Sequence, residues 1–371
     1  MVTHVPFFDL HRQYILLAEE IQTAMQPIFN GSQYSGGAEV QRFESDFSSY
    51  CGVSQSVGVS SGTSALHLAL LAAGVTEGDE VITTPMTFVA TAAAIEYCGA
   101  RPVFVDCDPL TLAIDPDKIG AALTRRSKAI IPIHLHGRLI NMEPICELAL
   151  REGLIVIEDA AQAHGAQRNG RKAGAWGTVG CFSFYPSKNL GAYGEGGALT
   201  TNDPEIAKRA RAMRNWGSEE RYLHKFKGFN YRMDGLQAAV LRVKLRYLDD
   251  WNQARQSFAR RYTDQLKELN LTLPAHSDVG SHVYHVYAVQ TPRRDDLQRW
   301  LEARGIGTSI HYPIPVHLQE AYRSPEYPAG SFPVCEKVTS QLLSLPLFPE
   351  MTDEMVDRVC DEIKSFFQAQ G

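Results

Sequence analysis

The sequence predicts an α/β fold in which a mostly parallel central sheet is flanked by helices and followed by a smaller C-terminal α+β domain. Between residues 50 and 205, short apolar runs alternate with helical patterns, as expected for βαβ units. Most of these runs are apolar at nearly every position, which is typical of parallel strands covered on both faces. The chain has 371 residues, 44% of them hydrophobic, which suits one large or two medium domains.

The N-terminal part is expected to begin with two helices. Apolar residues recur at helical spacing over 9–29, and a polar loop separates this helix from a second one over 40–50. Strands and helices then alternate, with the clearest helical patterns at 64–73, 88–98 and 142–151. The expected strands are 56–61, 80–85, 101–106, 128–135, 153–159, 179–184 and 196–201.

The rest of the chain is expected to be helical over 233–269 and mixed afterwards. Its predicted elements are a strand at 282–290, a helix at 294–304, a strand at 307–311 and a last helix at 352–367. This pattern predicts a large domain over 1–250 and a small domain over 251–371.

Composition and charge argue against several classes of function. The formal net charge of −6 gives no general attraction for nucleic acid or an anionic membrane, and Lys and Arg do not cluster with aromatic residues. No stretch approaches the ~20 apolar residues that span a bilayer, and His4, Asp9 and Arg12 argue against a signal peptide. The seven cysteines are dispersed without a CxxC pair, so we expect reduced thiols, no zinc site and a cytoplasmic protein.

The segment SSGTSALHLAL (60–70) indicates a phosphate site. A strand ends in a small polar turn and a helix begins, so free backbone N–H groups point outward, and the hydroxyls of Thr63 and Ser64 add donors. The alternative is simple capping of the helix by serine or threonine. Neither a GxGxxG nor a GxxxxGK[ST] pattern is present, so neither a dinucleotide nor a nucleoside triphosphate is indicated.

The segment VIEDAAQAHGA (156–166) places Asp159 at the end of a buried strand. Ligands of α/β proteins bind at this edge of the sheet, where a carboxylate can hold a cationic ring nitrogen and Gln162 can share the site. The alternative is that Asp159 caps the following helix. His164 is more readily explained by packing or a hydrogen bond than by catalysis.

Lys188 follows the strand at 179–184 and precedes a glycine-rich loop. A lysine amine shielded from water loses basicity and becomes a nucleophile toward carbonyl groups, and the glycines leave room for a bulky ligand. The alternative is an ordinary solvated lysine in a loop.

Phe88, in PMTFVATAAAI (85–95), follows a strand and opens a helix, where an aromatic ring can stack on a flat cofactor. Alone it is more often a core residue. A phosphate cradle, an acid for a pyridinium, a stacking ring and a nucleophilic lysine together match one ligand, pyridoxal 5′-phosphate.

These motifs resemble those of the DegT/DnrJ/EryC1/StrS aminotransferases, the sugar aminotransferase branch of the aspartate aminotransferase fold (fold type I). The resemblance covers nearly the whole chain in the same order. The matching segments are SSGTSALHLAL, PMTFVATAAAI, VIEDAAQAHGA, CFSFYPSKNLGAYGEGGALTT (181–201), GFNYRMDGLQAAVLRVKL (228–245) and GIGTSIHYPIPVHLQ (305–319).

The resemblance implies a role for each residue of the cofactor site. Lys188 would bind pyridoxal phosphate covalently, Asp159 would pair with the pyridine nitrogen, and Gln162 would contact the phenolic oxygen. Phe88 would stack on the ring. The phosphate would be held at the turn formed by Gly62, Thr63 and Ser64, together with Ser183.

The resemblance also implies contacts beyond one cofactor site. Asn230 would reach the phosphate of the cofactor in a neighbouring subunit, which makes the active unit a homodimer. Arg232, His311 and Tyr312 would approach a nucleotide-sugar substrate, with His317 as a weaker addition.

The implied reaction is transamination (EC 2.6.1 class). The amine of a donor amino acid displaces Lys188, which then moves a proton from the donor's α-carbon to the C4′ carbon of the cofactor. The same steps in reverse transfer the amine to a ketone, so the two substrates react in turn by a ping-pong mechanism.

The favoured substrate is a 3-keto-hexose linked to a nucleotide, with glutamate as amino donor; the segment HYPIPVHLQ favours position 3. The alternatives are a 4-keto nucleotide sugar, a keto-inositol, and, from a different class, a non-catalytic regulator. A dehydratase on the same scaffold is disfavoured because Lys188 is present. Two loops, HLHGRLINM (134–142) and SGGAEV (35–40), depart from the family pattern at positions expected to affect substrate choice and not the cofactor.

Overall fold

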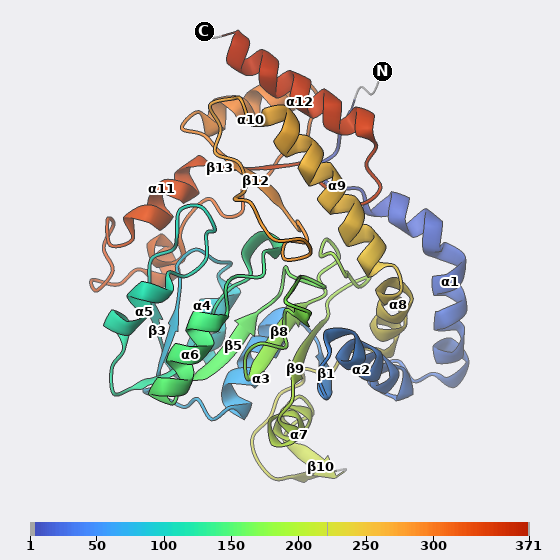
Figure 1. The fold of residues 1–371 in the computed structure, drawn as a ribbon. Helices are drawn as coiled ribbons and strands as arrows, with labels where there is room; N and C mark the ends of the chain where they lie inside the picture. The colour runs from blue at the N-terminus through green and yellow to red at the C-terminus, as the bar shows by residue number, and fades with distance from the viewer. Residues whose placement is uncertain (1–3, 221, 370–371) are drawn as a thin grey trace.

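The computed structural model describes residues 4–220 and 222–369, and a seven-stranded sheet in the order β1-β9-β8-β5-β4-β2-β3 forms its centre (Figure 1). The strands from β8 to β3 are parallel, and β9 runs antiparallel to both of its neighbours. All the strands predicted between residues 50 and 205 are therefore found, and the mostly parallel sheet is confirmed. Their bounds are β1 (Gln55–Val59), β2 (Glu80–Thr83), β3 (Arg101–Phe104), β4 (Ser127–Ile130), β5 (Ile155–Asp159), β8 (Val179–Ser183) and β9 (Gly197–Thr201).

Helices cover both faces of this sheet. Successive residues of a strand point to opposite faces, so each strand contributes to two separate cores. Val81 and Ile157 belong to one core and their neighbours Ile82 and Val156 belong to the other. The first core is covered by α3 (Gly62–Ala72), α4 (Ala90–Tyr97) and α7 (Pro204–Met213). The second is covered by α2 (Ala38–Cys51), α5 (Pro116–Ala122), α6 (Glu143–Glu152) and α8 (Gly235–Leu245).

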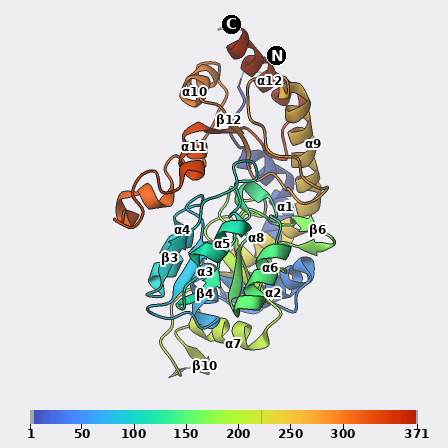
Figure 2. The same ribbon diagram turned by 60° about the vertical axis from the view of Figure 1, so that its left-hand side comes forward.

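A second group of elements lies beyond one end of the sheet, at the top of Figures 1 and 2. Its core joins residues of α9 (Leu248–Leu266), α10 (Arg294–Glu302) and α12 (Asp353–Gln368) to the antiparallel pair β12 (Tyr287–Gln290) and β13 (Leu342–Leu345). Val5 belongs to the same core, and its backbone bonds to Gly305 and Gly307. The division into domains 1–250 and 251–371 stays a prediction, and Val5 packs with the C-terminal group.

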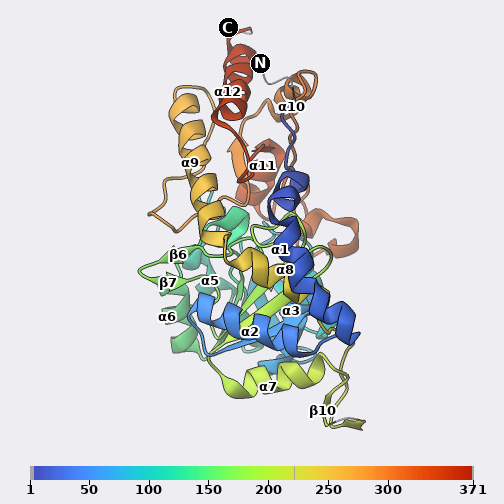
Figure 3. The ribbon, with the colours of Figure 1, turned by 90° about the vertical axis from the view of Figure 1, so that its right-hand side faces the viewer.

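The outer elements surround these two groups. Helix α1 (Leu10–Gly31) packs against α8 along one side, and the hairpin of β10 (Ser218–Glu220) and β11 (Leu223–His224) extends below α7 (Figure 3). A smaller core joins α4 to α11 (Pro333–Gln341). The remaining elements are the pair β6 (Gln167–Arg168) and β7 (Arg171–Lys172) and the 3-10 turns Leu135–Gly137, Val316–Leu318 and Glu320–Tyr322.

Two predicted elements differ from the structure. The strand expected at 307–311 is wrong, because this segment makes only a single bridge, Ser309 to Ser344, before the proline-containing loop. The helix expected over 233–269 is two helices, α8 and α9, which are separated at residues 246–247. Within 4–220 and 222–369, the helices are all too short or too polar to cross a membrane.

The contact between β8 and the loop before it predicts a steric effect on stability. A Cβ added at Gly180 would lie 2.3 Å from Gly174 Cα and 2.6 Å from Thr200 Oγ1, whereas one added at Gly120 in α5 meets nothing within 4 Å. We expect Gly180→Ala to lower the free energy of unfolding by about 1–3 kcal/mol and Gly120→Ala to raise it by about 0.5–1 kcal/mol. Urea denaturation of both variants measures this, and equal effects would contradict it.

Candidate active site

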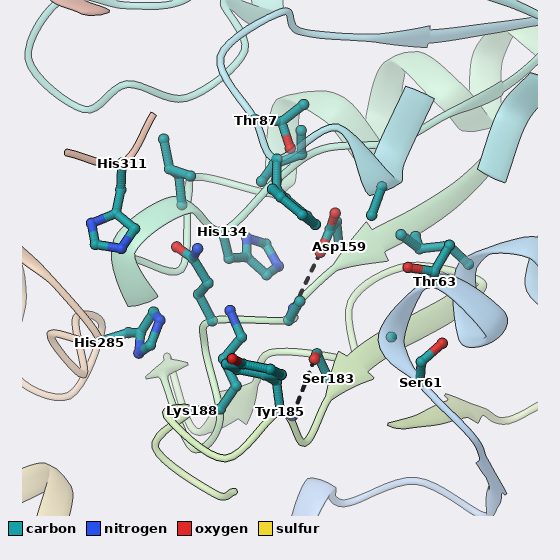
Figure 4. Close-up of a pocket in the computed structure, with 18 of the residues that line it drawn as sticks. Ser61, Thr63, Thr87, His134, Asp159, Ser183, Tyr185, Lys188, His285 and His311 are labelled. Atoms are coloured by element: carbon teal, nitrogen blue, oxygen red, sulfur yellow. Dashed lines mark hydrogen bonds between the residues drawn. The ribbon is translucent and has the colours of Figure 1, made fainter. Parts of the chain in front are cut away.

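A cavity of about 450 Å³ lies where β1, β2, β4, β5 and β8 end (Figure 4). This is the carboxyl edge of the sheet, which the sequence predicts as the site. Most of the predicted residues line the cavity, namely Gly62, Thr63, Phe88, Asp159, Gln162, Ser183, Lys188, His311 and Tyr312.

The N-terminus of α3 forms one end of the cavity. Ser61 caps the helix by accepting a hydrogen bond from Ser64 N (3.0 Å). The N–H groups of Gly62 and Thr63 precede the helical hydrogen-bond ladder and are available to an anion. A Cβ at Gly62 would lie 2.7 Å from Ser183 Cβ, so a glycine is required for this end of α3 to meet the end of β8. The result is a cradle of N–H and hydroxyl donors.

Asp159 lies in the middle of the cavity, at the end of β5. Its Oδ2 accepts a hydrogen bond from Thr91 Oγ1 (2.8 Å), and its Oδ1 accepts one from Ala161 N (3.2 Å). Burial raises the pKa of this carboxyl group, and these two donors together with Lys188 and His134 oppose that rise. The predicted alternative, a helix cap, does not apply, because the residues directly after Asp159 form turns and no helix.

Lys188 follows β8 and faces Asp159 across the cavity (Figure 4). Its backbone N–H bonds to Tyr185 O (2.8 Å), which closes a turn that directs the side chain inward. Burial of the amine lowers the pKa of Lys188 from 10.5 to about 8, with Asp159 opposing the change. At neutral pH a useful fraction of this amine is therefore uncharged and nucleophilic.

Phe88, Gln162 and Tyr312 form the side of the cavity near the C-terminal group. The rings of Phe88 and Tyr312 lie 5.3 Å apart, and Gln162 Nε2 donates to the Tyr312 hydroxyl (3.1 Å). Gln162 Oε1 accepts from His136 N (2.6 Å). His136 Nε2 is 3.0 Å from His311 O and donates to it. Gln162, which follows β5 of the central sheet, is thus connected through hydrogen bonds to His311 and Tyr312 of the C-terminal part of the chain.

His311, His164 and His285, which lie around Lys188, are uncharged near neutral pH because their pKa values are lowered. Burial, with a smaller contribution from the Lys188 charge, lowers the pKa of His311 to about 4 and that of His164 to about 3. His164 is fully buried between the rings of Phe182 and Phe184, which confirms the interpretation as a packing residue.

Four predicted site residues do not line the cavity. The Ser64 hydroxyl is bonded to Ser60 and Ser61 inside the first turn of α3. Asn230 is exposed and Arg232 donates to Asn215 Oδ1 (3.0 Å). His317 is fully buried and bonded to Glu336 (3.1 Å), so the structure does not support its predicted substrate contact.

The sequence interpretation missed several lining residues, including His134, Tyr185, Glu195, His285 and Thr87. His134 follows β4, so the rule that ligands bind at strand ends could have identified it. His285 lies far along the chain, before β12, and no local signal places it beside Lys188.

The donors in the cavity fit pyridoxal phosphate. The cradle at α3 suits a phosphate, the Asp159 carboxylate suits a protonated ring nitrogen, and Phe88 can lie against a flat ring. The Lys188 amine, with its lowered pKa, suits an aldehyde. The fold and this cavity together define the class of fold-type-I proteins that bind pyridoxal phosphate.

The comparisons with known proteins give the family. Residues 16–364 match the model of the DegT/DnrJ/EryC1/StrS aminotransferase family, and the chain belongs to that family. The chain is 45% identical over 98% of its length, and 99% of the relative, to a "Pleiotropic regulatory protein" of Geobacillus stearothermophilus. It is 44% identical, over 98% of its length and 96% of the relative, to a "dTDP-3-amino-3,4,6-trideoxy-alpha-D-glucose transaminase" of Streptomyces venezuelae.

Solved structures agree with this family. The S. venezuelae protein DesV, solved "in complex with ketimine intermediate", has a TM-score of 0.96 and 43% identity, and covers 99% of both chains. The Bacillus subtilis protein ntda, solved "with bound cofactor pmp", has a TM-score of 0.91 and 34% identity, over 99% of this chain and 86% of that one. The predicted family, the fold and the class of enzyme, a pyridoxal-phosphate-dependent aminotransferase, are confirmed.

The lowered pKa of Lys188 predicts a pH dependence of the apoprotein. Between pH 8 and 10.5 the unfolded chain holds a proton on this lysine that the folded chain has lost, so stability rises with pH across this window. We expect the wild type to gain stability over this range relative to Lys188→Met. Lys244, whose pKa is also about 8, is retained in both proteins and cancels. Urea midpoints at several pH values measure the difference.

The same pair of proteins tests the assignment of the lysine. Wild type with added pyridoxal phosphate should develop a visible absorption band, and Lys188→Met should not. A parallel pH dependence in both proteins would contradict the lowered pKa, and a band in Lys188→Met would contradict the covalent role.

Proposed function

We propose that this aminotransferase converts a keto group on a nucleotide-linked sugar to an amine, with a 3-keto-hexose as favoured substrate and glutamate as amino donor. The observation that supports it most is the placement of the Lys188 amine and the Asp159 carboxylate in one buried cavity with a phosphate cradle at α3. The substrate class is supported by the name of the S. venezuelae transaminase.

The proposed cofactor contacts follow from the positions of the donors. The backbone of Gly62, together with the hydroxyls of Thr63 and Ser183, would hold the phosphate at the positive end of the α3 dipole. Asp159 would hold the ring nitrogen, and Phe88 would cover the ring face. Gln162 Nε2, which already points toward the Tyr312 hydroxyl, would donate to the phenolic oxygen. Bound pyridoxal phosphate supplies an electron-accepting ring that stabilises negative charge on the carbon losing a proton.

Lys188 would move the proton in both half-reactions. Its Nζ is uncharged above about pH 8, so once it is released from covalent attachment it can accept a proton from the donor's α-carbon. Lys188 would then give this proton up again, so that one amine serves as base and as acid. Asp159, as an anion, would hold a protonated ring nitrogen, which favours loss of the proton from the donor's α-carbon. The uncharged histidines add no competing positive charge at the amine.

The proposed substrate contacts lie at the C-terminal side of the cavity. His311 is held by Ser344 Oγ (2.9 Å at Nδ1) and lies against the Phe7 ring, with the ring centroids 5.7 Å apart. His311 and Tyr312 would therefore present fixed polar groups to the sugar. Arg232 is outside this chain's cavity, and we propose that it reaches substrate bound to a neighbouring subunit.

A homodimer is proposed because Asn230 and Arg232 lie outside the cavity of their own chain. The exposed face of α1 supports such an interface, because apolar side chains rarely stay exposed together on monomers. These side chains include Tyr14, Ile15, Leu16 and Phe29, which are 39%, 61%, 72% and 45% exposed. A cytoplasmic location is also proposed, and the free state of all seven cysteines supports it.

The regulatory alternative has one observation in its favour, the name of the Geobacillus stearothermophilus relative. The buried Lys188 with its lowered pKa argues for catalysis, since a binding module does not require a nucleophilic amine. The substrate test below separates the two.

Substrate choice is tested with a panel of ketones. Purified holoenzyme is incubated with glutamate and 3-keto nucleotide sugars, 4-keto nucleotide sugars or keto-inositols, and the products are identified by mass spectrometry and NMR. We expect amination of a 3-keto sugar, with 2-oxoglutarate formed in equal amount. Turnover of 4-keto sugars alone would overturn the preference for position 3, and no turnover of any ketone would favour the regulator.

The role of Asn230 is tested with mixed dimers. In a dimer of one Lys188→Ala subunit and one Asn230→Ala subunit, an Asn230 acting on its partner leaves one complete site. We expect about half of the wild-type activity, because independent sites contribute additively. An Asn230 acting within its own subunit would leave no complete site and no activity.

The reciprocal dimer is the matched control. Wild type paired with a subunit that has both substitutions should be inactive if Asn230 acts on its partner, and half-active if it acts within its own chain. An active Asn230→Ala homodimer would show that the residue is not needed.

A further inference from the structure

We propose that Thr87 and Thr91 form a two-hydroxyl relay that holds the Asp159 carboxylate in place as an anion, so that Thr91 is a positioning residue for the reaction. The proposal rests on the proposed function of Asp159 as the partner of the cofactor's ring nitrogen. It is based on three buried polar groups whose distances and donor capacities leave one arrangement of hydrogen bonds.

The three oxygens lie in a chain. Thr91 Oγ1 is 2.8 Å from Asp159 Oδ2, and Thr87 Oγ1 is 2.9 Å from Thr91 Oγ1. An ionised carboxylate only accepts hydrogen bonds, so the single proton of the Thr91 hydroxyl must point at Asp159. Thr87 is then the donor to Thr91. All hydrogen bonds of the relay therefore run toward the carboxylate.

Burial makes this relay important for the charge. Thr91 is fully buried, Thr87 is 4% exposed and Asp159 is 7% exposed, so bulk water cannot replace the hydroxyl of Thr91. A buried carboxylate without donors is unstable as an anion, and hydrogen bonds to a charged group are stronger than those between neutral groups. A donor that is itself polarised by a second hydroxyl is stronger again.

Other groups near Asp159 do not replace this donor. Ala161 N occupies Oδ1, at the longer distance of 3.2 Å. Lys188 and His134 act on the pKa of Asp159 electrostatically and not by a hydrogen bond to it, while Tyr312 and Cys181 are neighbours whose own pKa values are raised partly by Asp159. Among the groups that oppose the effect of burial on the pKa of Asp159, Thr91 is the largest. Two donors leave further lone pairs of the carboxylate for a ring N–H.

The relay also fixes the residue expected to cover the cofactor ring. Phe88 lies between Thr87 and Thr91 in sequence, at the turn that leads into α4, and Thr91 N bonds to Phe88 O (3.2 Å). The same turn therefore positions both the Asp159 carboxylate and Phe88, which line the same cavity.

The test compares four variants of the full-length protein. Thr91→Val has the same shape without a hydroxyl, and Thr91→Ser restores the hydroxyl. Thr87→Val removes the second member of the relay. Thr83→Val is the matched control, because the fully buried Thr83 hydroxyl donates to Ile131 O (2.9 Å) and not to Asp159.

Two readouts are used. The dissociation constant of pyridoxal phosphate is measured by absorbance titration of each apoprotein. The pKa of Asp159 is measured in the same apoproteins by NMR of ¹³C-labelled aspartate carboxyl groups, with the resonance assigned by its absence in Asp159→Asn. The second readout requires no cofactor and no activity.

We expect Thr91→Val to raise the dissociation constant about tenfold and the pKa of Asp159 by about one unit, as the loss of one charge-assisted hydrogen bond implies. Thr87→Val should raise the dissociation constant of pyridoxal phosphate by about threefold or less, because it acts only through Thr91. The pKa of Asp159 should also rise in Thr87→Val, by less than in Thr91→Val. Thr91→Ser and Thr83→Val should leave the dissociation constant within about twofold of the wild-type value and the pKa of Asp159 unchanged, even where the melting temperature falls.

Equal effects of Thr91→Val and Thr83→Val would overturn the relay, since they would reflect only the loss of a buried hydrogen bond. An unchanged pKa of Asp159 in Thr91→Val would also overturn it. If the wild type fails to bind pyridoxal phosphate, the proposed function fails instead, and the NMR titration still decides whether Thr91 holds the carboxylate. If Thr91→Val does not fold, Thr87→Val must still raise the pKa of Asp159. An unchanged pKa of Asp159 in Thr87→Val would then overturn the relay.

Discussion

The close approach of α3 to the ends of β8 and β9 is the constraint on which the site depends. A Cβ at Gly62 would lie 2.7 Å from Ser183 Cβ, and a Cβ at Gly197 would lie 2.3 Å from the carbonyl carbon of Ser61. Any larger residue would push the helix N-terminus away from Ser183 and open the phosphate cradle. Because β8 leads directly to Lys188, the same contact sets the separation between the cradle and the amine.

The alternation of side chains along β5 solves a second problem, the placement of two adjacent carboxylates in a buried strand. Asp159 faces the cavity, whereas Glu158, which is fully buried, faces the other side of the sheet. There Glu158 accepts backbone hydrogen bonds from Gly174 (2.9 Å), Trp176 and Gly177 (both 2.7 Å), and it bonds to His134 Nε2 (2.9 Å). Each carboxylate thus has its own donors, and the cavity contains Asp159 as the charge that faces Lys188.

The part of the fold that sequence predicts well is the part set by local patterns. Apolar runs and turn residues predict the strands of the central sheet, and the rule that ligands bind at strand ends predicts Asp159 and Lys188. The cradle at α3 was also predicted, because capping and anion binding use the same N–H groups.

What the sequence could not predict depends on contacts between distant segments. His285 reaches the cavity from a segment before β12, and the burial of His317 against Glu336 depends on how the loop before α11 folds. Thr91 belongs to a motif that was identified, but its hydroxyl gains a function only through the distance to Asp159. The strand expected at 307–311 failed for the same reason, since its pairing is limited to one bridge with Ser344.

The roles proposed for the site divide between the central sheet and the loops. Asp159 and Ser183 belong to strands of the central sheet, and Lys188 follows one of them, so the sheet fixes their positions. The substrate side depends on loops: His136 joins Gln162 to the carbonyl of His311, and Arg138 donates to the carbonyls of Ala275 and His276. Both His136 and Arg138 belong to the 134–142 loop that departs from the family pattern. Under the roles proposed above, a change in that loop would act on Gln162 and on the His311 carbonyl, and would leave Asp159, Ser183 and Lys188 in place.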